Sequence, residues 1–209
     1  MSPARRLIGV RLIPTRVEDS LRWIRPDLWQ RLLPFGLAAL VVWLIWRPAW
    51  LGFAWGWLPV QVVFGLVAAP LLFVAALSVA KALARRRGTM LVPADARDAW
   101  LQAGYYLLNG PLEEAFFRGV VQGGLSAFVH PLAGFLVGTA AYVFYHRLGR
   151  WPWPDTLATA LLGVPLGLAF WLLPGAPSLL GVSIAHVGAT CGFLGPGPWL
   201  LARTRQPVR

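Results

Sequence analysis

No Asp, Glu, Lys or Arg occurs between positions 156 and 202, which read TLATALLGVPLGLAFWLLPGAPSLLGVSIAHVGATCGFLGPGPWLLA. The Pro and Gly cluster at 174–177 is a turn signal that divides this stretch into two apolar segments, 156–173 and 178–195. Each segment is close to the roughly 20 residues that a helix needs to cross the hydrocarbon core of a bilayer. The stretch therefore predicts two transmembrane helices joined by a short turn.

Further uncharged runs cover 32–46, 51–80 and 119–145, and the whole chain of 209 residues is 57% hydrophobic and only 13% charged. This apolar surface exceeds what the core of one soluble domain can bury. Backbone amides inside a bilayer must be paired within their own segment, which favours helices over open sheets. We expect an all-α, polytopic helical bundle with about six transmembrane helices and additional interfacial helices.

The segment from Asp98 to Phe128 would extend roughly 46 Å as a single helix, which is longer than the ~30 Å hydrocarbon core. Asn109-Gly110-Pro111 is the predicted break. It divides the segment into an interfacial helix over 96–108 and a transmembrane helix over 111–128, with Pro111 at the first helical position. The next transmembrane helix is expected over 131–146.

The formal net charge of +11 has a topological explanation. When six spans are threaded through a membrane, seventeen of the nineteen Lys and Arg residues fall on one side, Arg47 falls on the other and Arg118 lies within a span. By the positive-inside rule the first side is cytoplasmic, so both chain ends are expected in the cytosol. The chain is then expected to be a multi-pass protein of the cytoplasmic membrane. The basic surplus then indicates affinity for anionic lipid headgroups, and we expect no nucleic-acid partner.

Three regions follow from this threading. Residues 1–31 mix Arg with large apolar residues and predict a basic amphipathic arm on the headgroups. Residues 32–202 form a single intramembrane domain, and residues 203–209 form a basic cytosolic tail.

Two of the eight acidic residues, Glu113 and Glu114, begin the predicted third span, where ionisable groups are costly. Glu114 precedes Arg118 by four residues, which is the favourable order for an ion pair on a helix. Glu113 has no cation three or four residues ahead. Its carboxylate either caps a helix that begins after Gly110 or performs chemistry.

Two histidines, His146 and His186, lie in other predicted spans. A partly desolvated carboxylate can accept a proton from water, and an imidazole can orient that water or donate to an oxyanion. Glu113, His146 and His186 therefore suit hydrolysis by an activated water. Zinc ligation by the same three residues is an alternative by ligand type, although no His-Glu-x-x-His helix is present. We expect no cofactor, and Cys191 is assigned no role.

Three motifs carry a resemblance to a known family, and they are Glu113-Glu114-Ala115-Phe116-Phe117-Arg118, Tyr142-Val143-Phe144-Tyr145-His146 and His186-Val187-Gly188-Ala189-Thr190. Together they resemble the CPBP family of glutamate-type intramembrane proteases, which includes the CAAX prenyl endopeptidases and the Abi, or bacteriocin-processing, proteins. The family pattern is Glu-Glu-x-x-x-Arg, an aromatic residue with His four positions later, and His-x-x-x-Asn or Asp.

The resemblance implies a role for each matching residue. Glu113 and His146 would activate the hydrolytic water, while His186 and Thr190 would stabilise the oxyanion. The supporting residues would be Glu114, Arg118 and Tyr142.

This chain departs from the family pattern at two positions. Tyr142 replaces the usual Phe, and Thr190 replaces the Asn or Asp. A hydroxyl still donates one hydrogen bond, but loss of an oxyanion donor can cost about 10²–10³ in rate. Thr190 therefore bears directly on activity and on the class of substrate.

The resemblance implies an intramembrane endopeptidase that cleaves a membrane-anchored protein or peptide. In prokaryotic relatives this would mean leader peptides, C-terminal sorting tags or targets of self-immunity. Two other classes remain open, namely an inert membrane scaffold or immunity protein, and a small transporter with Glu113 as its proton site. The absence of paired inverted halves disfavours the transporter.

Overall fold

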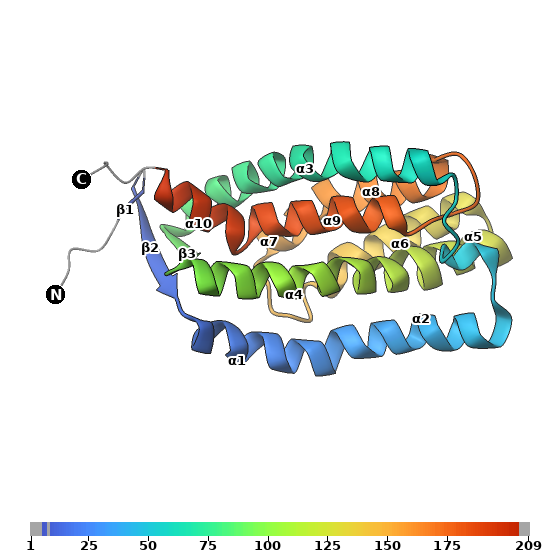
Figure 1. Cartoon of the computed structure of the whole chain (residues 1–209), viewed down its shortest axis with the longest axis horizontal. Coiled ribbons are helices and arrows are strands. Elements are labelled where there is room, and N and C mark those ends of the chain that lie inside the picture. Colours follow the sequence, from blue (N-terminus) through green and yellow to red (C-terminus); the bar gives the residue numbers. More distant parts are fainter. Residues whose placement is uncertain (1–5, 8, 205–209) are drawn as a thin grey trace.

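The computed structural model describes residues 6, 7 and 9–204. Long helices run side by side along the molecule, and a small sheet lies at one end of the bundle (Figure 1). The first five residues of the predicted arm and residues 205–209 of the predicted tail lie outside the described residues.

The strands are β1 (Arg6–Leu7), β2 (Val10–Thr15) and β3 (Thr89–Pro93). The α-helices are α1 (Val17–Asp27), α2 (Leu33–Trp46), α3 (Leu58–Arg87), α4 (Ala96–Glu114), α5 (Gly124–Phe128), α6 (Pro131–Tyr145), α7 (Trp153–Ala158), α8 (Ala160–Leu172), α9 (Leu180–Phe193) and α10 (Pro196–Arg203). Wider π-helical segments, η1 (Leu28–Leu32) and η3 (Ala115–Gly123), continue α1 and α4, and η2 (Ala49–Leu51) is a short 3₁₀ turn.

The sheet is the one departure from the predicted all-α class. β1 and β2 are antiparallel, and β2 pairs in parallel with β3, so that Arg11 lies opposite Thr89. Val10, Met90 and Val92 are buried and pack with Ala84 of α3. The alternating apolar pattern of β2 and β3 is too short to be recognised as strands beside the flanking helices. The rest of the described chain is mainly helical, as expected.

The first long helix begins earlier than predicted. α1, η1 and α2 form one helix from Val17 to Trp46, whereas the sequence predicted a span that starts at 32 after an arm on the headgroups. Pro26 lies inside α1 and lacks an amide hydrogen, and the π-helical segment η1 follows it directly. The helix therefore accommodates the proline by widening, and residues 17–31 continue into α2 without a break. Their placement on the headgroups stays a prediction.

The predicted break at Asn109-Gly110-Pro111 is wrong, as is the role of Gly110 as a helix cap. α4, η3 and α5 continue one another from Ala96 to Phe128. Gly110 packs against α9, where a Cβ atom would lie 2.9 Å from Cγ2 of Val187, and the π-helical segment η3 follows the missing amide of Pro111. The helix does not need a break because its first turns pack beside the small sheet (Figure 1), so the hydrocarbon core need not cover its full length.

Within the described residues, three helices are long and apolar enough to cross a membrane, namely Val17–Trp46, Leu58–Arg87 and Trp153–Leu172. Pro131–Tyr145 and Leu180–Phe193 are shorter apolar helices. These helices indicate a membrane protein. The number of six spans and their orientation stay predictions.

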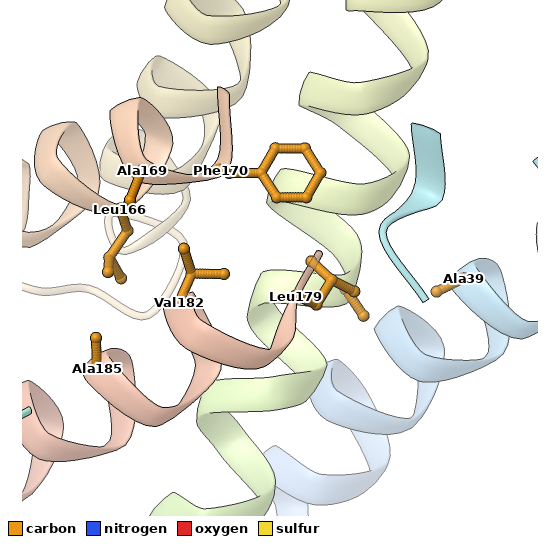
Figure 2. Packing of buried hydrophobic residues seen from close by; sticks show 8 residues of the cluster. Ala39, Leu166, Ala169, Phe170, Leu179, Val182 and Ala185 are labelled. Carbon is orange, nitrogen blue, oxygen red and sulfur yellow. The ribbon is translucent and has the colours of Figure 1, made fainter. Parts of the chain in front are cut away.

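The main apolar core lies between α2, η3, α8 and α9. Figure 2 shows its residues, which are Ala39, Ala115, Leu166, Ala169, Phe170, Leu179, Val182 and Ala185. The many small side chains allow the helix backbones to approach closely, which is how helices associate in a membrane.

Close approach is most pronounced between α3 and α9. A Cβ atom on Gly188 would lie only 2.4 Å from the carbonyl oxygen of Ala69, so Gly188→Ala must push backbone apart. We expect Gly188→Ala to lower the free energy of unfolding by about 1–3 kcal/mol. Gly104→Ala is the matched control, because Gly104 is also helical but has no atom near its added Cβ. Thermal unfolding in detergent should separate them, and equal midpoints would contradict the packing argument.

Candidate active site

The residues singled out from the sequence come together from three parts of the bundle. Glu113 and Glu114 end α4, Tyr142 and His146 lie at the end of α6, and His186 and Thr190 lie one turn apart in α9. Five of these residues line one cavity of about 900 Å³, and they are Glu113, Tyr142, His146, His186 and Thr190. Because α4 continues into η3 without a break, Glu113 lies within the bundle, where it lines the same cavity as His146 of α6 and His186 of α9.

Glu113 is anchored by one of its two carboxylate oxygens. Its Oε1 accepts hydrogen bonds from Nδ2 of Asn109 at 2.7 Å, from the hydroxyl of Tyr145 and from Nη1 of Arg31. Its Oε2 lies 3.6 Å from Nε2 of His186. Because three donors occupy Oε1, Oε2 is the oxygen that remains to contact a water or a substrate in the cavity. The side chain as a whole is only 3% exposed.

His186 is held in a defined orientation. Its Nδ1 lies 2.7 Å from Oε1 of Glu114, and because a carboxylate only accepts hydrogen bonds, Nδ1 carries a proton. Its Nε2 therefore points towards Oε2 of Glu113 and lies 3.5 Å from the hydroxyl of Tyr142. Glu114 thus orients His186, a function that the sequence did not suggest.

The predicted Glu114–Arg118 ion pair is present and fully buried. Nε of Arg118 lies 3.2 Å from Oε2 of Glu114, and both side chains are 0% exposed. The remaining donors of Arg118 contact Gln122 at 3.3 Å, Thr139 at 3.3 Å and the carbonyl oxygen of Gly163 at 2.9 Å. Neither member of the pair lines the cavity, so the pair supports the site from behind.

His146 lies at the end of α6 and lines the same cavity. Its Nδ1 is 2.9 Å from the carbonyl oxygen of Tyr142, and a carbonyl accepts, so Nδ1 donates and Nε2 of the neutral ring is left as an acceptor. The rings of Tyr145 and Trp151 pack against it, with centroids at 4.2 and 4.8 Å. His146 can therefore accept a proton at Nε2.

Sequence reasoning missed the residues that surround Glu113. Asn109 lies four residues before Glu113, so helical spacing could have found it. Tyr145 directly precedes His146 within the second motif, and helical spacing does not connect it to Glu113. Arg31 was assigned to the cytosolic arm, but its guanidinium forms an ion pair with Glu113 across 82 positions of sequence. Its only local signal is Asp27, four residues earlier, with which it also pairs.

The zinc alternative requires three ligands that face one ion. In the part of the chain that the structure describes, no three His, Cys, Asp or Glu side chains are grouped so as to hold a metal ion. Nδ1 of His186 is directed at Glu114 and Nδ1 of His146 at a carbonyl oxygen, which leaves one nitrogen of each ring for other partners.

Comparison with known proteins identifies the segment that carries Glu113, His146, His186 and Thr190. Residues 95–191 match the family model described as "Type II CAAX prenyl endopeptidase Rce1-like". This segment is Rce1-like. The Rce1-like segment contains all three motifs, from Glu113 to Thr190, and the resemblance to the CPBP and CAAX proteases is confirmed. No curated protein and no solved structure matches the chain.

The Rce1-like family is a protease family, so a hydrolase of the CAAX-protease kind is supported, with membrane-associated protein as the general class of substrate. Arg31 and Asp27 lie outside the matched segment. Part of the environment of Glu113 is thus supplied by the N-terminal helix of this chain.

Proposed function

We propose that the chain is a glutamate-type intramembrane endopeptidase that hydrolyses a peptide bond in a membrane-anchored protein or peptide. The observation that carries the proposal is that Oε2 of Glu113 lies 3.6 Å from Nε2 of His186, beside a cavity that His146 and Thr190 also line. An acid, two imidazoles and a hydroxyl around one space can activate water and bind the charge that develops in the transition state.

The proposed reaction uses these groups in order. A water attacks the carbonyl carbon of the scissile bond and gives a proton to Glu113 or to Nε2 of His146. The carbonyl oxygen becomes an oxyanion that accepts hydrogen bonds from Nε2 of His186, which donates when both ring nitrogens carry a proton, and from the hydroxyl of Thr190. The C–N bond then breaks, and the departing amine takes the proton that the water gave up.

The test is cleavage in vesicles that contain candidate membrane-anchored substrates, with the wild-type protein and Glu113→Gln in parallel. We propose the cytoplasmic membrane as its location, with leader peptides, C-terminal sorting tags and self-immunity targets as the substrates to try. Products from the wild type alone are the expected result. Equal cleavage by both proteins would contradict the proposal, and no cleavage by either would favour the inert scaffold.

The same assay with EDTA addresses the zinc alternative. We propose metal-free chemistry, so cleavage should continue at the same rate after chelation. Loss of cleavage that zinc restores would replace the water-activation scheme with metal catalysis by Glu113, His146 and His186.

Thr190 offers a narrower test of the oxyanion role. Thr190→Val keeps the shape of the side chain and removes its hydroxyl, so we expect cleavage to slow by about 10²-fold, near the lower end of the loss of an oxyanion donor. Thr190→Ser, which keeps the hydroxyl, should retain most of the rate. If kcat is the same for the Val and Ser variants, Thr190 does not contact the oxyanion.

A further inference from the structure

Arg31 makes the closest charged contact to Glu113 in the described residues. Its Nη1 donates both to Oε1 of Glu113 and to the hydroxyl of Tyr145, which itself donates to Oε1. The Arg31 side chain is 24% exposed, whereas that of Glu113 is 3% exposed. The cation therefore reaches the carboxylate from the side of the cavity wall that α1 and η1 form.

The guanidinium of Arg31 is fixed in this position by other groups. Nε lies 2.7 Å from Oδ1 of Asp27 and Nη2 lies 2.5 Å from Oδ2, which is the planar, two-point pairing that suits Arg and a carboxylate. Nη2 also donates to the hydroxyl of Tyr105 at 2.9 Å. Asp27 and Tyr105 thus hold the guanidinium of Arg31 so that its Nη1 points at Glu113.

The helix that carries Arg31 is fastened to the helix that carries Glu113. The hydroxyl of Thr15 donates to Asp98 of α4 at 2.7 Å, and Gln102 of α4 donates to the hydroxyl of Ser20 at 2.9 Å. Asp98 and Ser20 are both 0% exposed. The buried contact of Ser20 with Gln102 joins α1 to α4, and Thr15, the last residue of β2, adds a contact just before α1 begins.

We infer that Arg31 is a positioning residue that holds Glu113 ionised and anchors its Oε1, leaving Oε2 towards the cavity and His186. Burial disfavours the charged form of a carboxylate that is 3% exposed, and Arg31 supplies the compensating positive charge, whereas Asn109 and Tyr145 supply only neutral donors. A protonated Glu113 could not accept a proton from water. The effect of Arg31 on the rate of cleavage rests on the proposed function, whereas its effect on the ionisation of Glu113 does not. The role belongs to residues that lie outside the Rce1-like segment.

The kinetic experiment uses three variants. Arg31→Met removes the charge and keeps the length of the side chain, Arg31→Lys keeps the charge, and Arg25→Met is the matched control because Arg25 is exposed on the same helix. We expect Arg31→Met to lower kcat about 10- to 100-fold with KM changed less than about threefold, a smaller loss than removal of the base itself. Arg31→Lys should recover part of the loss, and Arg25→Met should match the wild type.

Guanidinium ion is the probe that separates charge from packing. Added guanidinium chloride, at concentrations that leave the wild-type rate unchanged, should restore part of the activity of Arg31→Met and none of that of Glu113→Gln. Wild-type kcat in Arg31→Met would overturn the inference. So would a loss that neither Lys nor guanidinium reverses, because that result indicates a packing role.

An infrared measurement keeps the inference testable even if the chain cleaves no substrate. The difference spectrum between the wild type and Glu113→Gln should contain the bands of an ionised carboxylate. The same difference taken in the Arg31→Met background should contain the carbonyl band of a protonated carboxyl, whereas the Arg25→Met background should match the wild type. A carboxylate band that persists in Arg31→Met would overturn the inference and leave the proposed function standing.

Discussion

Glu113→Gln is expected to lower kcat for cleavage by about 10²–10⁴-fold, which is the usual contribution of a general base. This loss corresponds to about 2.7–5.5 kcal/mol of transition-state stabilisation. A Gln side chain has nearly the same shape as Glu but cannot accept a proton from the attacking water. Substrate binding does not depend on that proton, so KM should change little and the loss should appear in kcat.

The fold should survive this substitution. Arg31 loses one partner in Glu113→Gln, but its bidentate pairing with Asp27 remains, and its side chain keeps some contact with solvent. Glu18→Gln is the matched control, since Glu18 is exposed in the first turn of α1 and undergoes the same chemical change. Cleavage measured for both variants in the same vesicles provides the comparison. If Glu113→Gln loses no more rate than Glu18→Gln, Glu113 is not the base.

The sequence predicted correctly those helices that have turn-forming residues at both ends. α6 begins at Pro131, as expected, and α9 (Leu180–Phe193) lies within the predicted segment 178–195. Pro111 was a false signal for a break, because the cost of a proline within a helix depends on the conformation of the next turns and on neighbouring helices. Here the π-helical segment η3 begins after Pro111, and Gly110 packs against Val187 of α9, a tertiary contact that no local pattern encodes.

Within the candidate site, helical spacing predicted contacts between residues of one helix but not contacts between different helices. The ion pair of Glu114 and Arg118 follows from a separation of four residues, and a motif places Glu113, His146 and His186 together. The contact of Nδ1 of His186 with Glu114 depends on how α9 is rotated against α4, which a single sequence does not report. The pairing of Glu113 with Arg31 was missed for the same reason, because 82 residues separate them.

Arg118→Met is expected to destabilise the folded protein by about 3–5 kcal/mol, because it leaves a buried charge without its partner. Arg118 is 0% exposed and its donors reach one carboxylate, one amide, one hydroxyl and one carbonyl oxygen. In the variant, Glu114 keeps only its contact with His186, and the other acceptors lose a buried donor. Thermal unfolding in detergent, or the yield of monodisperse protein, measures the effect.

Arg22→Met provides the surface comparison. Arg22 pairs with Asp19 at 3.8 Å, but the two side chains are 81% and 49% exposed, so the loss of that pair should cost less than about 1 kcal/mol. The identical chemical change is thus made once in the interior and once in solvent. A similar loss of stability in Arg22→Met and Arg118→Met would show that the buried network contributes nothing particular to the fold.

A double variant separates stability from catalysis. Glu114→Leu combined with Arg118→Met removes both charges, and an apolar pair in place of a buried ion pair is often neutral in stability. We therefore expect the double variant to be more stable than Arg118→Met alone. It should still cleave slowly, because no carboxylate then accepts the Nδ1 proton of His186 and the contact that orients its ring is lost. Recovery of both stability and rate would mean that Glu114 supports the fold alone and does not orient His186.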